Sequence, residues 1–227
     1  MSKFDQDLKV RFSKQVFDFS QEKQLLSVTR DWFSINIPHW EFITSRYALQ
    51  TRPLEVLEIG SWEGLSTYWM LKNWPNCHIT CVDTWEGGDE HKDGSAATKE
   101  ILDNYENNFD SNLKAYETRI TKVKTRSINF FGSSNQQFDV IYVDGSHNVC
   151  DVFVDVMESY ARLRVGGLLI LDDYFWRHYL NIYQNPAVAI NLFLRIASGT
   201  YSLVHFNHQI VIQKVLPAKP NVKNPLH

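Results

Sequence analysis

The chain has 227 residues and a formal net charge of −3, and 44% of its residues are hydrophobic and 14% aromatic. This length and this apolar content are sufficient for one domain with a full hydrophobic core. The small negative charge provides no basic surface for nucleic acid or for an anionic membrane, so we expect neither as a partner.

The first 52 residues favour irregular helical structure. They begin with MSKFDQDLKV, which is charged where a secretory signal would be apolar. The sequence contains no run of about 18 apolar residues, and we therefore expect a soluble, cytoplasmic protein. Aromatic residues recur through the segment, at Phe12, Phe17, Phe19, Trp32, Phe33, Trp40, Phe42 and Tyr47. They indicate either a helical cap over an active site or extra helices packed at the edge of a sheet.

From Leu54 onward, short apolar runs alternate with helical segments, which is typical of parallel β-α-β units. The pattern predicts strands at residues 54–59, 78–82, 121–125, 138–143 and 168–171. Apolar residues at spacings of three and four predict a helix from Val149 to Leu163, and a second helical run begins at Pro186. Two short runs within residues 201–215, separated at Asn207 and His208, predict an antiparallel hairpin.

The first candidate site is the glycine turn in VLEIGSWEGLS, where a buried strand ends at Gly60 and a helix begins near Gly64. Glycine permits a close backbone approach, and the helix amino end offers unpaired N–H groups to a polar ligand. Asp83 ends the next strand, where Rossmann-like sites place a carboxylate for the ribose hydroxyls. Trp62 stands where dinucleotide enzymes have their second glycine, so the turn favours a smaller adenosine-containing ligand. An ordinary strand-to-helix turn is the alternative.

The second candidate site consists of carboxylates at two other strand ends, in FDVIYVDGSH and GGLLILDDY. Because ligands bind at the carboxyl ends of parallel strands, we expect Asp144, Asp172 and Asp173 to converge on one crevice. Carboxylate oxygens favour Mg²⁺ or a similar divalent cation over zinc. Adjacent Asp172 and Asp173 can serve one metal only if the strand ends between them. Each aspartate could instead be a turn or cap residue.

His147 follows Asp144 by three residues on the loop that leaves the same strand. Near a metal, it would be placed to accept a proton from a substrate hydroxyl that the metal has acidified. The alternative is a polar residue of a surface loop.

Together, the segments EIGSWEGLS, VDTWEGGDEH, FDVIYVDGSH and LRVGGLLILDDYFW resemble the class I S-adenosylmethionine-dependent methyltransferases. The resemblance is greatest to the metal-dependent sugar O-methyltransferases of the macrocin O-methyltransferase type. It implies an α/β, Rossmann-like fold: a three-layer αβα sandwich with a mostly parallel seven-stranded sheet and a C-terminal antiparallel hairpin. The methyltransferase domain would span residues 53–216, after an N-terminal helical extension or cap (1–52) and before a loose C-terminal tail (217–227).

The resemblance also implies roles for individual residues. Glu58 and Gly60 would lie near the methionine part of S-adenosylmethionine, Asp83 at its ribose and Ser127 near its adenine. The full set of candidate cofactor-binding residues is Glu58, Gly60, Ser61, Trp62, Asp83, Thr84, Ser127 and Asp144.

For catalysis, the resemblance implies that Asp144, Asp172 and Asp173 bind Mg²⁺ or another divalent cation and that His147 is the base. A hydroxyl of a small molecule or sugar, bound to the metal, would lose its proton to His147 and attack the sulfonium methyl. A homo-oligomer is compatible with this interpretation. Two other functions stay open: an NAD-dependent oxidoreductase, which would leave the three aspartates without a task, and a non-catalytic cofactor-binding protein, which would need neither metal nor His147.

Overall fold

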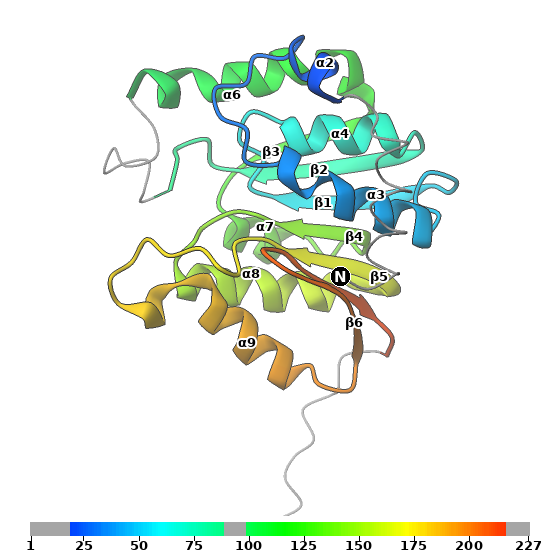
Figure 1. Cartoon of the computed structure of the whole chain (residues 1–227), viewed down its shortest axis with the longest axis vertical. Helices are drawn as coiled ribbons and strands as arrows, with labels where there is room; N and C mark the ends of the chain where they lie inside the picture. The colour runs from blue at the N-terminus through cyan, green and yellow to red at the C-terminus, as the bar shows by residue number, and fades with distance from the viewer. Residues whose placement is uncertain (1–18, 89–98, 217–227) are drawn as a thin grey trace, which may run out of the picture.

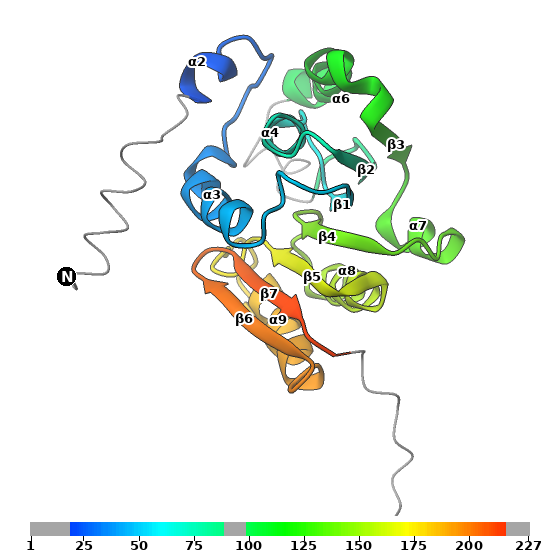
Figure 2. The same ribbon diagram turned by 90° about the vertical axis from the view of Figure 1, so that its right-hand side faces the viewer.

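The computed structural model describes residues 19–88 and 99–216. At its centre is a seven-stranded sheet with the strand order β3-β2-β1-β4-β5-β7-β6, and helices cover both of its faces (Figures 1 and 2). Strands β1 to β5 pair in parallel, whereas β7 runs antiparallel to both β5 and β6. This arrangement confirms the predicted three-layer α/β fold with its C-terminal hairpin.

The strands are β1 (Leu54–Ile59), β2 (Cys77–Asp83), β3 (Ile120–Lys124), β4 (Phe138–Val143), β5 (Leu163–Leu171), β6 (Tyr201–Phe206) and β7 (Ile210–Lys214). The α-helices are α2 (Phe19–Lys23), α3 (Ile37–Arg46), α4 (Leu65–Asn73), α6 (Lys99–Leu113), α7 (Ser127–Ser133), α8 (Val149–Arg162) and α9 (Pro186–Ile196). Three short 3₁₀ helices are η1 (Ser34–Asn36), η2 (Lys114–Arg119) and η3 (Ile182–Gln184).

Strand β5 begins at Leu163, earlier than the predicted Leu168. The two glycines of the VGG segment interrupt the apolar run, and Gly166 adopts a left-handed backbone with φ of +86°. The pairing of β5 with β4 is irregular at the same place, where the register shifts between Phe138 and Val140. The glycines therefore mark an irregularity inside the strand and not its beginning.

The core consists of two apolar layers, one on each face of the sheet. Helices α3, α4 and α6 contribute to the first layer, and α7, α8 and α9 contribute to the second. Trp40 of α3 is fully buried in the first layer, where its ring stacks on Trp74 and meets Trp69 and Tyr142 edge to face. The predicted N-terminal extension thus supplies part of the central core through α3. Within the described residues, we find no helix with the length and apolar character that a membrane span requires.

Candidate active site

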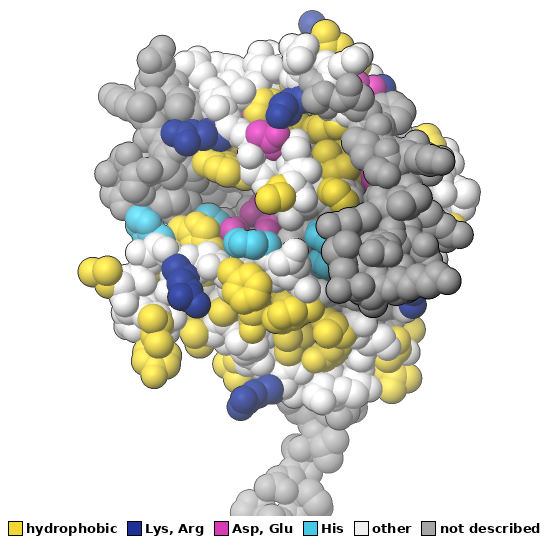
Figure 3. All heavy atoms as spheres, in the orientation of Figure 1, with side chains coloured by type: hydrophobic (Ala, Val, Ile, Leu, Met, Phe, Trp, Pro, Cys, Tyr) yellow, Lys and Arg dark blue, Asp and Glu magenta, His cyan; other side chains and the backbone are white. Residues whose placement is uncertain are grey.

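A cleft with a volume of about 790 Å³ opens where the carboxyl ends of β1, β2, β4 and β5 meet. Its lining brings together most of the predicted site residues: Gly60, Ser61, Trp62, Asp83, Thr84, Ser127, Asp144, His147, Asp172 and Asp173. Figure 3 shows acidic and histidine side chains gathered near the middle of one molecular face. Of the predicted residues, only Glu58 is outside the lining of this cleft.

Gly60 allows the turn between β1 and α4 to lie directly against the backbone of Asp144. Its φ is +83°, and a Cβ atom at this position would be 1.9 Å from the Asp144 carbonyl oxygen. The Gly60 N–H donates to the Val82 carbonyl at 2.9 Å, and the Asp144 N–H donates to the Ile59 carbonyl at 2.8 Å. Only glycine fits this approach, which fixes the two candidate sites relative to each other.

Glu58 lies beneath the glycine turn and is fully buried. Its carboxylate accepts hydrogen bonds from the hydroxyls of Ser61 (2.7 Å) and Ser66 (2.6 Å) and from that of Thr67. Burial raises the pKa of Glu58, and these hydroxyls partly offset the rise. Because the side chain does not reach the cleft, its place in the structure suits holding the turn in shape.

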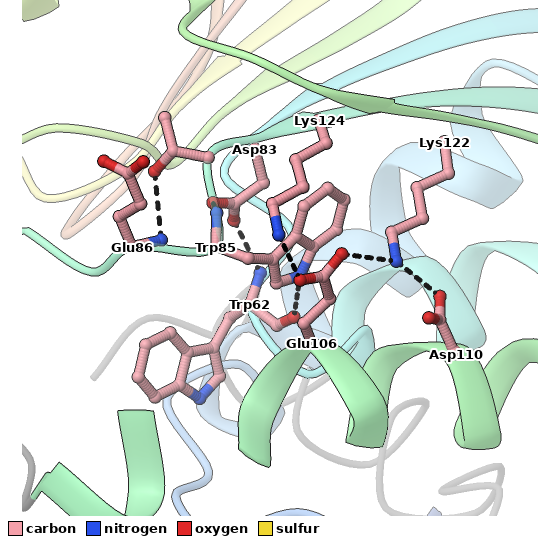
Figure 4. A network of polar contacts seen from close by, with 9 residues as sticks. Trp62, Asp83, Trp85, Glu86, Glu106, Asp110, Lys122 and Lys124 are labelled. Atoms are coloured by element: carbon pink, nitrogen blue, oxygen red, sulfur yellow. Dashed lines mark hydrogen bonds and ion pairs between the residues drawn. The ribbon is translucent and has the colours of Figure 1, made fainter. Parts of the chain in front are cut away.

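Asp83 is held by the backbone of two neighbouring loops (Figure 4). One carboxylate oxygen accepts the N–H groups of Ser61 (2.8 Å) and Trp62 (3.0 Å), and the other accepts the N–H of Trp85 (2.8 Å). A carboxylate offers about four lone-pair positions, so Asp83, which lines the cleft, can accept one further donor. This geometry is compatible with the predicted contact to ribose hydroxyls.

The strand that precedes Asp172 and Asp173 ends before both residues, and not between them as the sequence condition required. Strand β5 ends at Leu171, so Asp172 and Asp173 lie beyond it, and Asp173 has a left-handed backbone with φ of +60°. Potential ligand atoms of Asp144, His147 and Asp173 all lie within 4.8 Å of one another. The compact group contains His147, whereas Asp172 lines the same cleft outside this group.

Asp172 is instead engaged in hydrogen bonds. One of its oxygens accepts the Tyr142 hydroxyl (2.5 Å) and the Gln209 amide (2.6 Å), and the other accepts the Asp173 N–H (2.8 Å). The Tyr142 oxygen also lies 2.8 Å from a carboxylate oxygen of Asp144. The Tyr142 hydroxyl therefore lies between the two carboxyl groups and has one proton to donate to them.

The three aspartates concentrate negative charge in little space. Loss of water around Asp144, together with the charges of Asp172 and Asp173, raises the pKa of Asp144 well above its usual value. Burial and the charge of Asp173 likewise raise the pKa of Asp172, to about 6. Clustered oxygen donors of this kind suit a hard divalent cation, and the residues present thus fit the predicted metal.

His147 is fixed on two sides. Its Nε2 lies 2.8 Å from a carboxylate oxygen of Asp173, and its ring stacks on Trp176 with 4.3 Å between the centroids. An imidazole oriented by a carboxylate is a common arrangement of a general base. Trp32 also lines the cleft, and the centroid of its ring lies 5.4 Å from that of Trp62.

Asp155 and Gln209 are site residues that the sequence did not reveal. Asp155 lines the cleft from α8, and burial raises its pKa to about 7. The available signal was a lone carboxylate on the apolar face of that helix, between Val152 and Val156. Gln209 had no local signal, because its contact with Asp172 depends on the pairing of β7 with β5.

Comparison with known proteins agrees with this architecture. A family model described as a methyltransferase domain matches residues 57–174, just over half of the chain. A comparison with curated proteins gives no match.

Several solved structures share the fold. An O-methyltransferase from Bacillus cereus in complex with SAH (S-adenosylhomocysteine) is 14% identical, with a TM-score of 0.61 over 92% of this chain and 97% of that one. Cofactor-bound Rv0187 from MTB is 14% identical, with a TM-score of 0.60 over 91% and 95%. The MycE methyltransferase of the mycinamycin biosynthetic pathway, in complex with Mg and SAH, is 16% identical, with a TM-score of 0.58 over 96% of this chain. The present chain spans only 56% of MycE.

At these identities, the structural likeness concerns the fold. The family match is independent of it and includes the glycine turn and the three strand-end aspartates. The chain therefore belongs to the methyltransferase-domain family.

Proposed function

We propose that the protein is an S-adenosylmethionine-dependent O-methyltransferase that acts, with a divalent cation, on a hydroxyl of a small molecule or sugar. One observation carries the proposal: a single cleft is lined both by the glycine turn with Asp83 and by the cluster of Asp144, His147 and Asp173. A methyl donor at the turn and an acceptor at the cluster would share one enclosed space, as group transfer requires. Two structural relatives, an O-methyltransferase with SAH and a methyltransferase with Mg and SAH, support this proposal.

The donor would bind along the glycine turn. The backbone of residues 60–62 and the amino end of α4 would face its polar methionine part, and Asp83 would accept the ribose hydroxyls. Ser127, at the start of α7, would lie towards the adenine of the donor. Glu58 would act indirectly, through the shape of the turn.

Asp144 and Asp173 would hold the cation, and Asp172 with Tyr142 would orient them. A divalent cation bound there would lower the pKa of an acceptor hydroxyl and fix its position. His147 would then accept the hydroxyl proton, and the carboxylate of Asp173 would stabilise the imidazolium that forms. The acceptor oxygen gains the methyl carbon as the bond from that carbon to the sulfonium sulfur breaks, which leaves SAH.

Calorimetric titration of SAH, with and without Mg²⁺, tests the proposal. We expect the wild-type protein to bind both, and Asp144→Asn to lose most of its Mg²⁺ affinity. Asp110→Asn is the control, because this exposed residue of α6 forms only a surface ion pair with Lys122. Absence of SAH binding to the wild-type protein would contradict the proposal, and NAD would then be the next ligand to titrate.

Turnover separates the enzyme from a non-catalytic cofactor-binding protein. Vicinal diols, which can chelate a metal, are the first acceptors to screen with labelled S-adenosylmethionine. We expect His147→Gln to bind SAH normally but to lower kcat by about 10²- to 10⁴-fold, the usual contribution of a general base. An unchanged kcat in this variant would exclude His147 as the base.

A further inference from the structure

Asp155 has a buried carboxylate oxygen that the fold leaves without a partner. The residue is only 2% exposed, and its Oδ1 has no hydrogen-bond partner among the described residues. The residue nevertheless belongs to the lining of the cleft. Buried polar atoms are almost always hydrogen-bonded, so this oxygen points to a ligand that carries a donor.

Two of the neighbouring polar groups bond to another residue. Ser146 and Arg126 both interact with Asp151, one turn earlier on α8, at 3.0 and 3.2 Å. The Ser127 hydroxyl interacts with the Asp155 carboxyl group, and Oδ2 of that group lies near Gly145. Among the described groups, none neutralises Asp155 by direct ion pairing.

The position of Asp155 in the cleft indicates which part of a ligand it would meet. This step rests on the proposed function, in which the ribose lies at Asp83 and the methyl group lies at the aspartate cluster. The remaining wall on this side is formed by Val82, Thr125, Ser127, Gly145 and Asp155. A planar base attached to that ribose would lie against this wall, with its polar edge towards the carboxyl group.

We propose that Asp155 Oδ1 accepts a hydrogen bond from the exocyclic amino group of the donor's adenine and so selects adenine over bases that lack this group. A carboxylate and a neutral carboxyl group both offer an acceptor oxygen, so the contact does not depend on the protonation state. In this arrangement, Asp155 is a specificity-determining residue of the donor site and has no part in the chemical step.

Binding of two ligands to four proteins tests this assignment. The ligands are SAH and its 6-deamino analogue, which has purine in place of adenine. The proteins are the wild type, Asp155→Ala, Asp155→Asn and, as a matched control on the same helix, Asp151→Ala. Calorimetry gives the ratio of the two dissociation constants for each protein, and circular dichroism checks that each variant is folded.

We expect the wild-type protein to prefer SAH by about 5- to 150-fold, the effect of leaving one buried acceptor unpaired. Asp155→Ala should bind both ligands equally, whereas Asp155→Asn, which keeps an acceptor oxygen, should retain the preference. Asp151→Ala should leave the ratio of the two dissociation constants as it is in the wild-type protein.

A wild-type ratio near one, or an unchanged ratio in Asp155→Ala, would overturn the assignment while leaving the methyltransferase proposal intact. If the wild-type protein binds no SAH at all, both proposals fail. The wild-type ratio needs no variant, so the test does not depend on the folding of Asp155→Ala.

Discussion

Backbone conformation at single residues fixes the geometry of the cleft. Gly60 and Asp173 both have positive φ angles, +83° and +60°. For Asp173, this conformation is unusual but tolerated by aspartate, and strain of this kind is concentrated at functional sites. For Gly60, the decisive constraint is space, because the Asp144 carbonyl occupies the place of a side chain.

Gly60→Ala and Gly166→Ala separate the effect of space from that of conformation. Both glycines have φ above +80°, but a Cβ on Gly166 would meet no atom within 4 Å. We expect Gly166→Ala to lower the free energy of unfolding by about 1–2 kcal/mol, the cost of a left-handed non-glycine residue. Gly60→Ala should lower the free energy of unfolding by more than this. It should also weaken SAH binding, because the turn must move away from Asp144. Urea denaturation and calorimetry measure the two effects, and equal losses in the two variants would contradict this account.

Local motifs made most of the site residues predictable. Gly60, Asp83 and Asp144 each follow an apolar run, so their place at a strand end could be inferred from the sequence alone. The different hydrogen bonding of the adjacent aspartates could not, because the partners of Asp172 are Tyr142 of β4 and Gln209 just before β7. Hydrogen bonds between residues that are far apart in the sequence leave no local sequence pattern from which they could be predicted.

Among the elements, β7 is connected to the metal-binding candidates through the residue that precedes it. Gln209 precedes this strand, and its side chain accepts the indole N–H of Trp40 at 2.8 Å and donates to Asp172 at 2.6 Å. Helix α3, the hairpin and the aspartate cluster are thereby joined by one chain of hydrogen bonds. Hydrogen bonds of this kind orient metal ligands and affect affinity as strongly as some ligands do.

Gln209→Leu should therefore weaken Mg²⁺ binding by about 10- to 100-fold, as is typical when a supporting hydrogen bond is lost. Gln213→Leu is the control, because this half-buried residue of β7 donates to the Gly166 carbonyl at the far end of the strand. Calorimetric titration of Mg²⁺ into both variants provides the comparison. Equal Mg²⁺ affinity in Gln209→Leu and the wild type would show that Asp172 does not need this support.

Strands were predicted more accurately than helices. The bounds of β1 and β4 agree with the prediction because each is a mostly apolar and mostly buried run, and α8 and α9 were indicated by their periodicity. Helices α6 and α7 were not predicted. The sequence of α6 is mostly polar, and its packing depends on a few residues such as Tyr105 and Phe109.

At the scale of the whole molecule, the segment before β1 is built into the main fold. Helix α3 shares one apolar cluster with α4, α6 and the sheet. Glu63, beside the glycine turn, also accepts hydrogen bonds from the backbone N–H of Thr29 (2.7 Å) and from Asn108 (2.8 Å). We propose that residues 19–52 and the methyltransferase domain unfold as one unit.

Trp40→Ala and Trp32→Ala test this proposal. Trp40 is fully buried, and its loss should lower the free energy of unfolding by about 3–5 kcal/mol, the usual effect of removing a large core side chain. Trp32 belongs to the same segment but is 49% exposed, so its removal should cost much less. In both variants, circular dichroism and fluorescence should follow one common transition. A separate early transition in Trp40→Ala would indicate an independent N-terminal unit.

The seven tryptophans of the chain divide into two groups by location. Trp32, Trp62 and Trp176 line the cleft, whereas Trp40, Trp69, Trp74 and Trp85 are buried. The protein thus carries its own optical reporters: a ligand in the cleft perturbs the emission of the first group, and unfolding perturbs that of the second. Iodide quenching with and without SAH can therefore follow occupancy in the unlabelled, unmodified protein.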